Sequence, residues 1–194
     1  METNMANIST TGFGLRPIKK VGQNDNNAAL SEWSIASGSA LISHHDLCKI
    51  TGDGVILTSA DADANNVGSL NGAFYTDPTS NKPTWSNYWP ASVAASDAVA
   101  FITDDPKQMY EIMSADTAFN QNEVGECADV VSAVGTTPLF ISKTKISATT
   151  ANTLATLKIL GVSRDPDHSD ITVEGFALRV MIDEHILGNN VAGI

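Results

Sequence analysis

From about residue 38 the chain is a series of short apolar runs separated by turn-forming residues. The runs at 40–43, 47–50 and 55–58 are divided by HHD and by TGDG, and the second of these is a turn signal. SLNGAFYT at 69–76 alternates as a half-buried strand does, and it lies between the polar stretches DADANN and DPTSNKP. This spacing predicts strands joined by turns.

The pattern continues through the rest of the chain. DAVAFIT at 97–103 and QMYEIMS at 108–114 flank DDPK and predict a hairpin. Further strands are expected within 128–134, 137–147, 153–163 and 172–186, with a short helix as the alternative over 148–160. Many short strands with Gly, Pro and Asp turns and no visible repeat indicate an all-β fold, a barrel or a sandwich.

The first thirty residues differ from this body. They are rich in Asn, Ser, Thr and Gly, and their few apolar residues cannot form a core by themselves. We therefore expect an extended N-terminal arm over 1–30 and a single β-rich domain over 31–194. Residues 1–27 carry a net charge of +1, so the remainder carries -12, and an arm of this kind is expected to meet an acidic surface.

The overall charge narrows the possible partners. The 194 residues hold 11 Lys and Arg against 22 Asp and Glu, which argues against coating nucleic acid. No run approaches the roughly 20 apolar residues of a membrane-spanning helix, and the N-terminus does not have the pattern of a secretory signal. Met5 is an alternative start to Met1.

Catalytic and metal-binding patterns are weak. His44, His45 and Asp46 form the one histidine cluster, but their spacing matches no zinc motif, and a solvated turn is the favoured interpretation. DADANN begins like a calcium loop but has Asn66 and Gly72 where glycine and glutamate are required. Cys48 and Cys127 match no metal spacing and are expected to be buried thiols, although a disulfide stays open.

No nucleophile motif and no phosphate-binding glycine loop is present. We therefore predict no catalytic residue, no cofactor and no metal, and a protein that is not an enzyme. A hydrolase that uses the His44–Asp46 region is the remote alternative.

One aromatic group has two interpretations. Trp85, Tyr88 and Trp89 lie between Pro83 and Pro90, where they could stack on sugars. A plug packed over the end of a barrel is the favoured alternative, because large aromatic side chains are more often buried than exposed.

Two stretches carry a family resemblance: LNGAFYTDPTSNKPTWSNYWPASVAASDAVAFITDDPKQMYEI and SRDPDHSDITVEGFALRVMIDEHILG. The FYTDP turn, the KPTW-x2-YWP loop, the DDP turn and the DPDHSD turn resemble small virion structural proteins of tailed bacteriophages, of the marine-phage type. The resemblance covers roughly residues 70–115 and 163–188. It implies a capsid decoration or cement protein.

The resulting expectation is a virion protein on the capsid surface, assembled in the host cytoplasm, that binds the major capsid protein and stabilises the head. A homotrimer would match the threefold positions of an icosahedral lattice. Alternatives are a head–tail connector or tail component, or a carbohydrate- or receptor-binding module. The expected partner-binding residues are Phe13, Leu15, Arg16, Ile18, Lys19, Lys20, Trp85, Tyr88 and Trp89.

Overall fold

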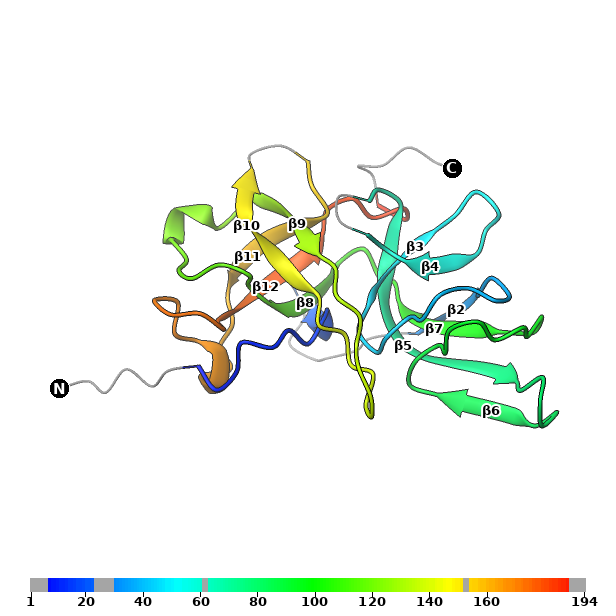
Figure 1. The fold of residues 1–194 in the computed structure, drawn as a ribbon. Coiled ribbons are helices and arrows are strands. Elements are labelled where there is room, and N and C mark those ends of the chain that lie inside the picture. The colour runs from blue at the N-terminus through cyan, green and yellow to red at the C-terminus, as the bar shows by residue number, and fades with distance from the viewer. Residues whose placement is uncertain (1–6, 23–29, 61–62, 152–153, 189–194) are drawn as a thin grey trace.

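The computed structural model describes residues 7–22, 30–60, 63–151 and 154–188, and nearly all of its regular structure is β (Figure 1). The strands are β1 (Arg16–Lys20), β2 (Ser31–Ser34), β3 (Leu47–Ile50), β4 (Ile56–Thr58), β5 (Asn66–Thr76), β6 (Pro83–Ser86), β7 (Val99–Thr103), β8 (Gln108–Met113), β9 (Cys127–Val131), β10 (Lys145–Ala151), β11 (Leu157–Val162) and β12 (Ala177–Ile182). Two single-turn 3-10 helices, η1 (Gln121–Glu123) and η2 (Pro166–His168), interrupt them. The prediction of an all-β fold is confirmed.

Two antiparallel sheets pack together. Sheet A has the order β1-β8-β12-β11-β9-β10, and sheet B has the order β2-β7-β5-β3-β4, with β6 paired to β5 outside this path. In Figure 1 sheet A lies to the left and sheet B to the right. Isolated bridges connect strands that are distant in each sheet: Ser114, after β8, with Ile146 of β10 in sheet A, and Ile35, after β2, with Ile56 of β4 in sheet B. Each sheet is therefore strongly curled.

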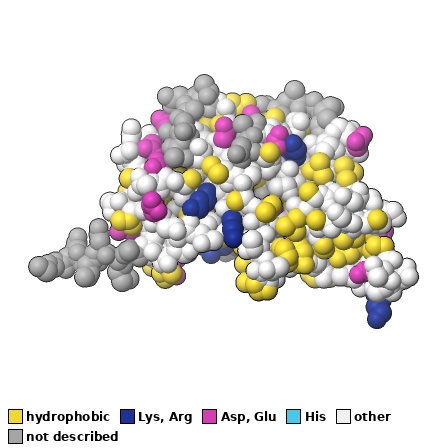
Figure 2. All heavy atoms as spheres, in the orientation of Figure 1, with side chains coloured by type: hydrophobic (Ala, Val, Ile, Leu, Met, Phe, Trp, Pro, Cys, Tyr) yellow, Lys and Arg dark blue, Asp and Glu magenta, His cyan; other side chains and the backbone are white. Residues whose placement is uncertain are grey.

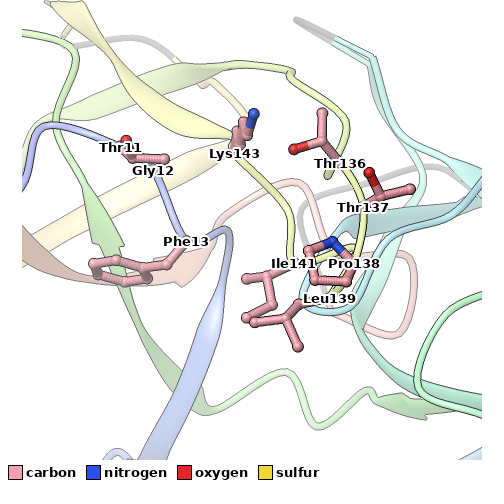
Figure 3. A pocket seen from close by; sticks show the side chains of 9 residues that line it. All are labelled: Thr11, Gly12, Phe13, Thr136, Thr137, Pro138, Leu139, Ile141 and Lys143. Atoms are coloured by element: carbon pink, nitrogen blue, oxygen red, sulfur yellow. The ribbon is translucent and has the colours of Figure 1, made fainter.

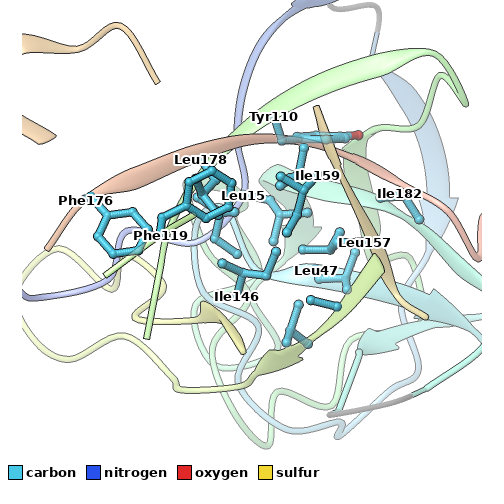
Figure 4. Packing of buried hydrophobic residues seen from close by; sticks show 14 residues of the cluster. Leu15, Leu47, Tyr110, Phe119, Ile146, Leu157, Ile159, Phe176, Leu178 and Ile182 are labelled. Carbon is cyan, nitrogen blue, oxygen red and sulfur yellow. The ribbon is translucent and has the colours of Figure 1, made fainter. Parts of the chain in front are cut away.

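Each sheet encloses its own hydrophobic cluster. The cluster of sheet A includes Tyr110, Leu157 and Phe176, and that of sheet B includes Ile56, Leu70 and Trp89. Figure 4 shows the first cluster, to which Leu47 is contributed by β3 of sheet B. This residue links the two cores.

The strand pattern follows simple alternation where one face is covered. In β11 every second residue from Leu157 to Gly161 is buried, as a period of two requires. All six residues of β8 are buried, including Glu111, so both faces of this strand are covered. An alternating burial pattern therefore marks a strand with one covered face, and a continuous one marks a strand with both faces covered.

The path of the chain corrects the predicted hairpin. Val99–Thr103 pairs with β5 and β2 in sheet B, whereas Gln108–Met113 pairs with β1 and β12 in sheet A. The turn between them leads from one sheet into the other. The hydroxyl of Tyr110 donates to the carbonyl of Thr103 at 2.7 Å across this junction.

The described part of the N-terminal segment belongs to the body. Arg16–Lys20 forms a strand of sheet A, and Leu15 is fully buried in the core of that sheet. Gly14 permits this course, because its φ is +71° and a Cβ there would lie 2.4 Å from the carbonyl oxygen of His45. The predicted boundary at residue 31 thus separates strands that share one body, and residues 1–6 and 23–29 of the predicted arm lie outside the described residues.

Other local predictions differ in part. The alternative helix over 148–160 is wrong, because its described ends belong to β10 and β11. Pro83–Ser86 is a strand inside the predicted aromatic loop, paired with Ala73–Thr76 of β5. Asn66, predicted to end a loop, begins β5, whereas residues 61–62 of that loop lie outside the described residues.

Both cysteines are buried and free, as the favoured interpretation expected. Burial raises the pKa of the Cys48 thiol well above its ordinary value. The two thiols therefore act as small core side chains.

Candidate partner-binding surface

Several of the predicted contact residues on β1 and before it are engaged inside the molecule. Leu15 has no exposed surface, so it cannot contact a partner. The Arg16 guanidinium binds the carboxylates of Glu111 and Asp165, and its Cζ lies 4.8 Å from the centre of the Phe13 ring. Burial of Leu15 corrects its assignment as a partner-binding residue, whereas the Arg16 side chain is 41% exposed and its assignment stays a prediction.

The remaining residues of β1 are half-buried. The Nζ of Lys20 lies 2.7 Å from Oδ2 of Asp105, so this charge is also used internally. Ile18 falls at a shift of register between Pro17 and Lys19. The backbone carbonyl of Lys19 accepts from the side-chain amide of Gln108 at 3.2 Å.

The three aromatic residues at 85–89 do not form one platform. Trp89 is fully buried in the core of sheet B, where its ring centre lies 5.1 Å from that of Tyr75. Backbone hydrogen bonds with Ile42, at 2.8 and 3.1 Å, hold it there. Trp89 is therefore a core side chain, and its assignment as a partner-binding residue is wrong.

Trp85 has the opposite environment. Its side chain is 54% exposed on the outer face of sheet B, with Phe74 directly opposite in the strand register. Its ring centre lies 4.9 Å from that of Phe101 on β7. We call Phe74, Trp85 and Phe101 the aromatic face.

Tyr88 joins β6 to the loop that precedes β10. Its ring stacks on that of Phe140 with 4.2 Å between centres. The side-chain amide of Asn87 donates to the carbonyl of Leu139 at 3.2 Å, and the backbone N–H of His44 donates to the carbonyl of Phe140 at 2.9 Å. The loop is therefore held beside sheet B.

This loop exposes three apolar side chains, Val134 (54%), Leu139 (62%) and Ile141 (38%), which we call the apolar loop surface. In Figure 2 hydrophobic side chains gather over the half of the molecule that holds sheet B, and most charged side chains lie outside that area. Large exposed apolar patches of this kind mark interaction sites on soluble proteins.

An open groove of about 290 Å³ lies between this loop and the N-terminal segment (Figure 3). Phe13 forms one wall, and Pro138, Leu139 and Ile141 form the other, with Lys143 also lining it. Among the partner-binding residues predicted in the N-terminal segment, Phe13 is thus the one that lines the groove beside the apolar loop surface. The groove offers apolar walls and a single cation.

Sequence reasoning missed the apolar loop surface because 137–147 was interpreted as one strand. The structure begins β10 at Lys145, and the residues before it form a loop with a cis Thr137–Pro138 bond. Gly135 and Pro138 were the available turn signals.

The His44–Asp46 segment is a turn, as expected, but it is only partly solvated, because His44 and His45 are half-buried. Asp46 is buried, and its Oδ2 accepts from the backbone N–H of Ser43 at 2.6 Å. The rings of His44 and His45 stack with 3.9 Å between centres. Burial, with a further contribution from His44, lowers the pKa of His45 to about 4, and burial raises the pKa of Asp46.

The backbone of this turn connects the two sheets. The N–H of His45 donates to the carbonyl of Leu70 on β5, and its carbonyl accepts from the N–H of Leu15, both at 2.9 Å. His45 itself has a φ of +65°. The segment acts as a structural joint.

Among the described ranges, no group of three His, Cys, Asp or Glu side chains is arranged to hold a metal ion. The same ranges contain no helix of the length and apolar character that crossing a membrane requires.

Comparison with known proteins gave no match to a family model, to a curated protein or to a solved structure. The function is therefore inferred from the surface of the chain and from its sequence.

Proposed function

We propose that the chain is a non-enzymatic structural protein of a bacteriophage virion, which binds the exterior of the capsid through the major capsid protein and stabilises it. The sequence resemblance to virion structural proteins points to this setting. The observation that carries the proposal is the apolar loop surface beside the groove.

The apolar loop surface has the character of a protein-binding site. Leu139 is 62% exposed at the tip of a loop whose base is fixed by Phe140 and Asn87. A fixed base lowers the ordering cost of binding, because less conformational freedom is lost on contact. Apolar anchors with a neighbouring pocket are typical of the centre of protein interfaces.

The charge distribution suits this role. The chain carries a formal charge of -11, which disfavours adsorption to nucleic acid while virions assemble. Lys143 lines the groove, so a partner segment that enters it would place an acidic group near that side chain.

The non-enzymatic part of the proposal is supported by the role of the histidine cluster. Asp46 binds a backbone N–H inside the turn, and the backbone of His45 bonds to both neighbouring segments. These contacts give the cluster a structural purpose without a reaction.

The test is binding to undecorated capsids of the phage that encodes the chain. Leu139→Asp places a charge at the centre of the apolar loop surface, and it should lower the ratio of bound chain to major capsid protein by at least tenfold. Leu154→Asp is the matched control, since Leu154 is also a half-exposed leucine but lies between β10 and β11. It should bind like the unaltered chain.

Equal occupancy by both variants would overturn this assignment of the surface. Copy number in virions gives an independent test of the role. A decoration protein should approach the copy number of the major capsid protein, and a chain present at only a few copies would instead be a connector or tail component.

A further inference from the structure

Strand β6 leaves part of its backbone unpaired. Thr76 on β5 directs its N–H toward β7, where it meets the carboxylate of Asp97 at 3.1 Å. Because successive residues of a strand point their backbone groups to opposite sides, Ala73 and Tyr75 face β6, where Tyr75 is opposite Thr84. The N–H and C=O of Trp85 therefore point away from the sheet, and no described residue bonds to them.

The other ends of the two sheets are closed or protected. Bridges join β2 to β4 and β8 to β10, as described above. The edge strand β1 reads RPIKK, and its proline, cations and register shift are features that natural sheets use to prevent edge pairing. β6 reads PTWS, so it shares a proline with β1 and Pro83 has no N–H to donate, but it carries no charge and no bulge.

An exposed apolar surface adjoins this open edge, because the side chain of Trp85 on β6 lies beside Phe74 of β5. The indole of Trp85 lies over Gly72 of β5, where an added Cβ would be 2.6 Å from its Cζ2 atom. Phe74 is 41% exposed beside it. The aromatic face thus extends to the last strand of sheet B.

We propose that β6 pairs with β6 of a second copy, antiparallel about a two-fold axis that passes beside Trp85. Each Trp85 N–H then donates to the Trp85 carbonyl of the other copy, and the two indoles become neighbours on one face. Sheet B continues from one molecule into the next, and the rows Phe74–Trp85 of both copies join.

A second copy is the occupant because this edge is complementary to itself. An antiparallel two-fold contact presents the same strand from both sides. Pro83–Ser86 carries no charge, so no like charges face each other, although each chain has a formal charge of -11. The two Lys82 side chains fall at opposite ends of the pair, about 20 Å apart at roughly 3.3 Å per residue.

The residues of the apolar loop surface are not part of β6, so the pairing can be tested on the isolated chain without capsids. It replaces the trimer expected from lattice symmetry with a two-fold contact. The oligomeric state of the isolated full chain tests it directly.

Sedimentation of a dilution series should give twice the chain mass of 20.4 kDa at high concentration, falling toward one chain mass on dilution. Trp85→Pro removes the N–H that faces the second copy and should abolish the dimer. An outward-facing proline is tolerated on an edge strand because its nitrogen is not needed for pairing with β5. Trp85→Phe keeps the N–H and an aromatic ring and should dimerise, as should Leu139→Asp.

Hydrogen exchange of the unaltered chain gives a measurement that needs no variant. The Trp85 amide should exchange at least tenfold more slowly in the concentrated sample than in the dilute one, whereas exchange at the Thr84 amide, already paired with β5, should change little. A single chain mass at every concentration, a mass of three chains, or a dimer that persists in Trp85→Pro would overturn the pairing.

Discussion

The guanidinium of Arg16 on β1 binds the carboxylate of Glu111 on β8, with Nε 3.0 Å from Oε2, although 95 positions separate the two residues in the chain. The Glu111 side chain is only 7% exposed, and it also accepts a hydrogen bond from the hydroxyl of Ser163. This contact fixes the first strand to its neighbour β8 in sheet A.

Arg16→Ala should therefore lower the free energy of unfolding by about 1–3 kcal/mol, because a buried carboxylate loses its charged partner. Chemical denaturation measures the change. Adding Glu111→Gln to Arg16→Ala removes the unpaired charge and should restore part of the loss. A double variant that is destabilised by the sum of the two single effects would contradict a direct coupling.

Leu15→Ala should cost about 2–5 kcal/mol, as deletion of a fully buried leucine side chain does. Ile18→Ala is the matched control, because Ile18 is half-buried three residues further on, in β1, and it should cost clearly less. Removal of residues 1–22 should lower the melting temperature for the same reason. An unchanged melting temperature would show that this segment is a separate arm and not part of the core.

Trp89→Ala should cost about 3–5 kcal/mol, since it empties the largest fully buried side-chain site of the molecule. Trp89→Phe should cost less, because the Trp89 Nε1 has no hydrogen-bond partner to lose. Trp85→Ala should change monomer stability by less than about 1 kcal/mol, in line with its exposure. Thermal melting of dilute samples would show the reverse order if the two tryptophans had been assigned to the wrong environments.

His45 makes stability depend on pH. Its pKa is lowered from 6.5 to about 4 in the folded chain, so the unfolded chain takes up its proton first as the pH falls. Stability should drop between pH 6.5 and pH 4, by on the order of 3 kcal/mol from this group.

His45→Asn should remove that part of the pH dependence, and asparagine tolerates the φ of +65° at this position. Asp46, whose pKa is raised by burial, acts in the opposite direction in both proteins, so the difference between their unfolding curves isolates the histidine. Parallel curves for the two proteins would contradict this role.

The strands that the sequence pattern placed well are those with local signals. Leu47–Ile50 agrees with its predicted range, because turn residues bound a short apolar run on both sides. β1 was missed because RPIKK has no apolar period, and its strand is stabilised by Glu111 far along the chain. Strands 97–103 and 108–114 were found, but local pattern cannot tell which sheet each one joins.

The surface was harder to predict than the fold. Trp85 and Trp89 have the same chemistry and lie four positions apart, and only the pairing of β6 with β5 and of Trp89 with Ile42 separates an exposed ring from a buried one. Leu15 looked like an arm residue because its core partners come from strands more than 30 residues away. The residues next to a side chain in the sequence cannot predict its burial when strands far along the chain cover it.

The excursion of the chain through sheet B has a consequence for biosynthesis. Residues 31–103 form all of sheet B and can close on emerging from the ribosome, whereas β1 is made first and needs β8. At roughly 5–20 residues per second, the 95 positions from Arg16 to Glu111 take about 5–20 s to synthesise. For at least that interval Leu15 has no core to enter, so the nascent chain exposes an apolar side chain that a chaperone can bind until sheet A is complete.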